Sequence, residues 1–119
     1  MITEDYVSFE TAKLLKEKEF NKDVYTMYMY DENGEAKDVL LLKVGEEPVL
    51  RPTLQMAMKW LREMHHLFIG IEYVNILGLG FVYQSTIGKF DDDYMYCLHK
   101  NSYEEACESA IKYCLENLI

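Results

Sequence analysis

Cys97 and His99 are the side chains whose types and spacing could most directly do chemistry. They lie two residues apart in a predicted strand, so both side chains point to the same face. A zinc site needs about four converging ligands. Cys107 and Cys114 are seven residues apart on a predicted helix, which separates them by roughly 10 Å along the axis. Both therefore cannot bind one ion, and we predict no metal site and core-packed cysteines.

A cysteine nucleophile would need a nearby base, and Cys97 or Cys107 with His99 or His66 are the available combinations. The sequence has neither a Gly-x-Ser-x-Gly elbow nor a recognised cysteine-protease signature. It also has neither Gly-x-x-x-x-Gly-Lys-Ser/Thr nor Gly-x-Gly-x-x-Gly, the runs that bind nucleotide phosphates. We therefore predict no catalytic residue and no cofactor. Burial of Cys107 on an apolar stripe would raise its pKa and reduce its reactivity.

Two further clusters resemble metal sites only in part. His65 and His66 are adjacent, whereas a metalloprotease helix spaces its histidines one turn apart as His-Glu-x-x-His. Asp91, Asp92 and Asp93 offer carboxylates, but a calcium loop also needs alternating oxygen ligands and a distal glutamate. We interpret both clusters as solvated surface.

The ten tyrosines are the stronger signal, because several cluster in predicted strands. Aromatic cross-strand pairs stabilise sheets, which is the ordinary explanation for them. Tyrosine is also enriched at protein interfaces. Tyr25, Met27 and Met29 share one face of the first predicted strand. If no helix covers that face, it would bind a protein partner or a second copy of the chain.

Charge and composition limit the class of protein. The net charge of -9 excludes the basic surface that nucleic-acid binding requires and disfavours anionic membranes. Three cysteines without a Cys-x-x-Cys pair indicate free thiols of a reducing compartment.

The sequence does not begin with the basic and apolar segments of a secretory leader. Its most apolar stretch, 67–83, contains Glu72, Asn75 and three glycines, so we do not expect it to span a membrane. We predict a cytoplasmic protein.

Three amphipathic helices are predicted to position these side chains. The first runs from Phe9 to Glu19 behind an N-cap at Ser8, and the second runs from Leu54 to His66 behind Thr53. Ser102 and Glu105 form a capping box for a third helix that ends near Asn117. Apolar residues at helical spacing mark their buried faces: Phe9, Ala12, Leu15 and Phe20; Leu54, Ala57, Met58, Leu61, Met64 and Phe68, widened by Met56 and Trp60; and Ala106, Cys107, Ala110, Ile111, Cys114, Leu115 and Leu118.

Five strands are predicted between the helices. Val24–Tyr30 and Asp38–Lys43 flank the turn signal Asp31-Glu32-Asn33-Gly34, which indicates an antiparallel hairpin. The strands 67–74, 81–87 and 94–99 follow the second helix, with turns at 75–80 and 89–93, and residues 45–52 read as a loop with two prolines. The sequence therefore predicts a single α+β domain over residues 1–119, in the order α-β-β-α-β-β-β-α. We expect three helices on one mostly antiparallel sheet of 4–5 strands, with an α/β/α sandwich as one arrangement.

Three stretches together resemble a family of uncharacterised small proteins of gut anaerobic bacteria and their phages or prophages: ITEDYVSFETAKLLKEKEF (2–20), RPTLQMAMKWLREMHH (51–66) and SYEEACESAIKYCLENLI (102–119). The layout is similar to the phage ABA sandwich domain. This resemblance covers the helices and implies a fold and a genomic context, but no activity.

The sequence leaves three hypotheses for the function of the protein, each of a different class. The first is a non-enzymatic interaction or accessory protein of phage or prophage type, which the lack of catalytic signatures and the tyrosine-rich strands favour. The second is an acidic inhibitor that mimics nucleic acid and targets a host DNA-binding protein, suggested by the net charge. The third is a small enzyme with a polar pocket at Cys97, His99 or the carboxylates at 91–93. The first is preferred, with an unidentified protein or a second copy as its partner.

Overall fold

The computed structural model describes residues 5–20, 28–30, 34, 36–38 and 49–119, with side chains at 28–30 and 36–38 left undescribed. The predicted α+β class and its three helices are confirmed. The predicted order of elements is also confirmed, with one short strand added before the second helix.

Each helix begins at the predicted N-cap. Helix α1 (Phe9–Glu17) starts after Ser8, helix α2 (Leu54–His65) after Thr53, and helix α3 (Tyr103–Asn117) after Ser102. In all three, the hydroxyl of the cap accepts a hydrogen bond from a backbone N–H in the first turn. The sequence therefore placed the starts of the helices correctly because their capping is local.

The predicted helix stripes form the core, with two corrections. The most deeply buried apolar side chains on the helices are Ala12, Leu15, Ala57, Leu61, Ala106, Cys107, Ala110, Ile111, Cys114 and Leu115. Met64 and Phe68 were predicted to share the buried face of the second helix, but both are exposed. Met64 lies in the last turn of α2. For Phe68, the reason is that α2 ends at His65 and His66 takes a left-handed conformation with φ 55°. Phe68 then belongs to a strand and lies on the sheet face away from the helices.

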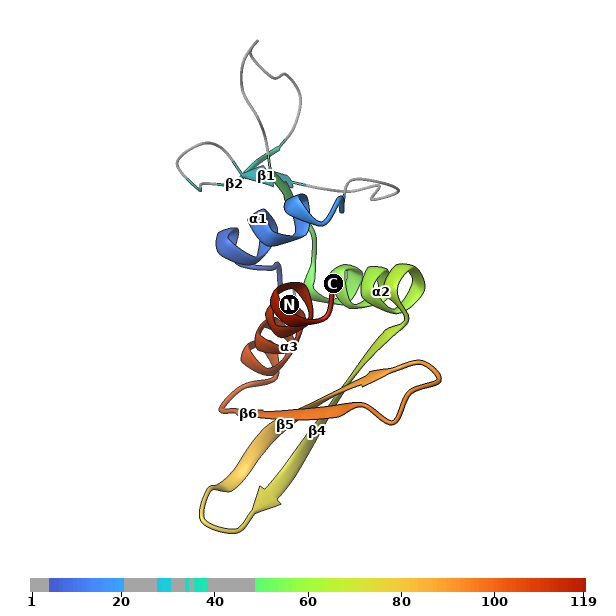
Figure 1. Cartoon of the computed structure of the whole chain (residues 1–119). Coiled ribbons are helices and arrows are strands. Elements are labelled where there is room, and N and C mark those ends of the chain that lie inside the picture. The colour runs from blue at the N-terminus through green and yellow to red at the C-terminus, as the bar shows by residue number, and fades with distance from the viewer. Residues whose placement is uncertain (1–4, 21–27, 31–33, 35, 39–48) are drawn as a thin grey trace.

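A small sheet in the order β2-β1-β3 lies beside α1 (Figure 1). Strands β1 (Tyr28–Tyr30) and β2 (Ala36–Asp38) pair antiparallel, which confirms an antiparallel hairpin in the described residues. The second strand begins at Ala36 and not at Asp38 as predicted, and residues 39–43 of the prediction lie outside the described residues. Strand β3 (Val49–Arg51) pairs antiparallel with the other edge of β1. The prediction of a loop over 45–52 was therefore wrong at residues 49–51. Two flanking prolines and a length of three residues hide this strand from any periodicity argument.

The larger sheet contains strands β4 (Leu67–Ile76), β5 (Gly80–Lys89) and β6 (Met95–Lys100) in sequence order, all antiparallel. Its inner face packs on the helices through Leu67, Ile69, Ile71, Ile87 and Leu98. The ring of Tyr96 stacks on Tyr113 of α3, with centroids 4.1 Å apart. The outer face carries the alternate residues, and no described helix covers it.

The helices lie between the two sheets (Figure 1). In the described part of the chain, two sheets of three strands take the place of the predicted single sheet of four or five. The described elements do not form an α/β/α sandwich. Sequence patterns identify strands but carry little information on which strands share a sheet, because that is decided by contacts between distant segments.

Candidate interaction surface

The β4–β5 hairpin extends past the rest of its sheet (Figure 1). Pairing between β5 and β6 ends at Tyr83 and Lys100, whereas β4 and β5 stay paired to Ile76 and Gly80. Among the described strands, the far end of the hairpin is therefore two-stranded. Where the pairing of β5 with β6 ends, helix α3 contacts β5 through its first residue. The ring of Tyr103 lies edge-on to the ring of Tyr83, with centroids 6.3 Å apart.

This end of the hairpin carries exposed apolar side chains, here named the tip patch: Tyr73, Leu77, Leu79 and Phe81. Leu77 is fully exposed, and the exposed fractions of Tyr73, Leu79 and Phe81 are 60%, 58% and 63%. The Tyr73 ring stacks on Phe81 at 5.4 Å and contacts Tyr83 at 4.8 Å between centroids. These rings support one another on a hairpin that the turn at Gly78 closes, where φ is 91°. Tyr73 and Phe81 thus lie in the paired strands, and Leu77 and Leu79 lie in the turn between them.

The segment that carries the tip patch contains no charged residue. Residues 73–88 include no Asp, Glu, Lys, Arg or His, although 28% of the whole chain is charged. The nearest charged residues in the sequence are Glu72 and Lys89, which flank this segment. Contiguous exposed apolar surface without charge is typical of a surface that another molecule covers.

Sequence reasoning missed this patch and chose another surface. Tyr25 and Met27 of the predicted interaction face lie outside the described residues, and Met29 is described only by its backbone in β1. That prediction therefore stays a prediction. The sequence did contain a signal for the tip: Leu77 and Leu79 are apolar residues within a glycine-bearing turn, where polar residues are usual.

Cys97 and His99 lie on the outer face of β6, both exposed. Each has a separate partner on β5: Cys97 Sγ lies 3.7 Å from Thr86 Oγ1, and His99 Nε2 lies 2.9 Å from Gln84 Oε1. Among the described residues, no three His, Cys, Asp or Glu side chains could hold a metal ion.

Cys107 and Cys114 are fully buried on α3. Burial raises the pKa of the Cys107 thiol to about 11 and that of Cys114 to about 12. Both are therefore neutral thiols at pH 7, which makes them poor nucleophiles.

These positions predict a difference in thiol reactivity. In the native protein, Ellman's reagent is expected to modify Cys97 quickly and to leave Cys107 and Cys114 unmodified, because only Cys97 is exposed. All three should react in denaturant. Cys97→Ser is the matched control and should abolish the fast phase. A fast phase that persists in this variant would contradict the burial of the helical thiols.

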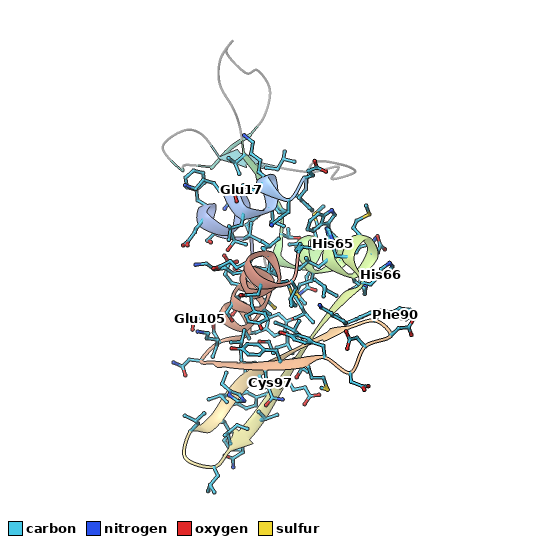
Figure 2. The ribbon with its side chains drawn as sticks, in the orientation of Figure 1. Glu17, His65, His66, Phe90, Cys97 and Glu105 are labelled. Carbon is cyan, nitrogen blue, oxygen red and sulfur yellow. The ribbon has the colours of Figure 1, made fainter. Side chains whose placement is uncertain are left out.

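The remaining sequence candidates are surface features. Asp91 and Asp92 lie in the turn after β5, where Asp92 Oδ1 accepts a hydrogen bond from the backbone N–H of Tyr94 at 3.2 Å. His65 and His66 lie at the end of α2 (Figure 2), and the His65 ring contacts Trp60 at 4.7 Å between centroids. Desolvation lowers the pKa of His65. These contacts stabilise a turn and a helix end, as expected for solvated surface.

An open hollow of about 520 Å³ lies between α3 and the segment that leads into α1. Its charged lining mixes both signs: Asp5, Lys100, Glu104, Glu105, Glu108 and Lys112. Glu108 Oε1 accepts a hydrogen bond from the backbone N–H of Ser8 at 2.9 Å, and Lys112 forms a 2.7 Å ion pair with Glu10. Glu108 thus has an intramolecular partner, and Lys100 and Lys112 interrupt the negative surface that a nucleic-acid mimic would need.

Comparison with protein-family models, with curated proteins and with solved structures finds no match. The resemblance to small proteins of gut bacteria and phages therefore stays a prediction. None of the helices in the described part of the chain is long and apolar enough to cross a membrane.

Proposed function

We propose that this protein is a non-enzymatic interaction protein that binds a protein partner through the tip patch. The observation that carries the proposal is the exposure of Tyr73, Leu77, Leu79 and Phe81 on a hairpin segment, residues 73–88, that has no charged side chain. Burying these side chains would remove apolar surface from water, which is favourable by about 25 cal/mol per Å². Leucine and aromatic side chains on a projecting hairpin fit a concave apolar pocket of another protein.

The unpaired backbone groups at the edges of the hairpin favour a protein over a lipid bilayer as the partner. A hairpin tip that enters hydrocarbon leaves the N–H and C=O groups of its two free edges without partners, at a cost of several kcal/mol per group. A protein pocket can supply those hydrogen bonds. The net charge of -9 also opposes approach to an anionic membrane.

The proposal is tested by affinity purification from the native host with three forms of the full chain. These are the wild type, a tip variant with Leu77→Ser and Leu79→Ser, and a control with Met64→Ser and Met95→Ser. The control removes apolar side chains of similar exposure, 65% and 69%, away from the tip. A partner that is held by the wild type and the control, lost by the tip variant, and bound again as a purified protein supports the proposal. Equal recovery by all three forms would overturn it.

A further inference from the structure

Strand β4 is an edge strand with unusual features. It pairs with β5 over ten consecutive positions without a bulge, and its other edge has no strand partner among the described residues. Soluble proteins usually protect such edges with lysines, prolines, bulges or short strands. Strand β4 has no lysine and no proline, and its single charged residue is Glu72. It is therefore a ready template for another strand.

The hydrogen-bond pattern shows which backbone groups face this edge. The N–H of Phe90 donates to the carbonyl of His66 at 2.9 Å, in the same register as the β4–β5 ladder. Hydrogen-bonded pairs alternate along an antiparallel ladder, so the even-numbered residues of β4 bond to β5. The odd-numbered residues then direct their N–H and C=O groups to the free edge: Leu67, Ile69, Ile71, Tyr73 and Asn75.

We infer that the free edge of β4 pairs with β4 of a second copy of this chain. The two strands run antiparallel about a two-fold axis beside Ile71, so that Ile71 of one copy faces Ile71 of the other. Such an interface is self-complementary, as closed dimers require. The odd-numbered residues of both copies then form the hydrogen-bonded pairs, and the two larger sheets join into one.

Charge and side-chain volume select this register. On the outer face, Glu72 of each copy lies opposite Gly70 of the other, where a Cβ would meet no atom within 4 Å. A shift that places Glu72 opposite Glu72 would bring two carboxylates together, and the opposite shift would place Glu72 against Phe68. Of these three registers, only the one centred on Ile71 avoids both unfavourable pairs, since like charges directly opposite destabilise a sheet.

The same register also matches exposed apolar side chains on both faces. Phe68, with 42% of its surface exposed, lies opposite half-buried Val74 of the other copy on the outer face. Tyr73, with 60% exposed, lies opposite Ile69 on the inner face. Pairs of an aromatic with a β-branched residue are among the favourable cross-strand pairs. The residues of the tip turn lie beyond the paired strands, so the dimer presents two tips at its opposite ends.

Charge swaps at Gly70 test the pairing in the full chain by sedimentation equilibrium. The wild type is expected to show a concentration-dependent monomer–dimer equilibrium. Gly70→Lys places an ammonium opposite each Glu72 and should lower the dimer dissociation constant about fivefold, whereas Gly70→Glu should raise it about fivefold. The open space around Gly70 lets both variants fold as monomers, which thermal unfolding can verify.

A wild type that stays monomeric at millimolar concentration, or a shift of both variants in the same direction, would overturn the inference. The tip variant with Leu77→Ser and Leu79→Ser should dimerise like the wild type, because its substitutions lie outside the paired residues. Failure of dimerisation and failure of partner binding are therefore separate results. The first concerns the edge of β4, and the second concerns the proposed function.

Discussion

Leu61→Ala is expected to lower the free energy of unfolding by about 3 kcal/mol, within the range for a buried leucine whose cavity is only partly refilled. Leu61 lies on the buried face of α2 with none of its surface exposed. It belongs to the core that joins the helices to the larger sheet. Urea denaturation followed by circular dichroism measures the change.

Leu77→Ala is the matched control, because it makes the same substitution at a fully exposed leucine of the tip patch. Its effect on the free energy of unfolding is expected to stay within about 0.5 kcal/mol. The pair of variants separates two uses of leucine in this chain: Leu61 stabilises the fold, whereas Leu77 contributes little to stability. A loss at Leu77 as large as the loss at Leu61 would show that the tip is packed in solution, which would remove the reason for assigning it to a partner.

Alkaline pH is expected to destabilise the protein through the buried thiols. In the unfolded chain a cysteine ionises near pH 8.5, whereas in the folded protein burial raises the pKa of Cys107 to about 11 and of Cys114 to about 12. Their stabilisation is therefore complete below about pH 8.5 and is lost as the pH rises toward the folded values. The free energy of unfolding should fall by roughly 2–4 kcal/mol between about pH 8.5 and 10.5.

The control for this prediction is the double variant Cys107→Ala and Cys114→Ala, which retains Cys97. It should be less stable at pH 7, because two buried sulfur atoms are lost, but its stability should decline much less with rising pH. Tyr94, whose hydroxyl lies 2.6 Å from that of Tyr113, titrates in both proteins and does not distinguish them. Parallel pH profiles for the two proteins would contradict the burial of the thiols as the cause.

The sequence predicted those parts of the fold that depend on local signals. Ser8, Thr53 and Ser102 each lie where an amphipathic stripe begins, and each caps a helix. A strand was also predicted over residues 67–74, and its inner side chains Ile69 and Ile71 pack on the helical core. These features need only neighbouring residues, so they could be derived without knowledge of the tertiary structure.

The parts that could not be predicted depend on distant contacts. Strand β3 exists because residues 49–51 pair with β1, which lies some twenty residues earlier in the chain. The division into two sheets, and the end of β6 before the tip of the hairpin, follow from pairings that no short pattern contains. The exposure of Tyr73 is of this kind, because no pattern in the neighbouring residues shows which elements pack over its ring.

Site-specific photo-crosslinking in native cells tests most directly whether the tip patch is the interaction surface. A photoreactive phenylalanine analogue replaces Leu77 in one form and Glu116, an exposed residue of α3, in the control. We expect the form with the probe at 77 to yield a discrete covalent adduct with a second protein, and the form with the probe at 116 to yield none. If residue 77 gives no adduct beyond the one seen at 116, the tip patch is not a binding surface and the proposed function is wrong.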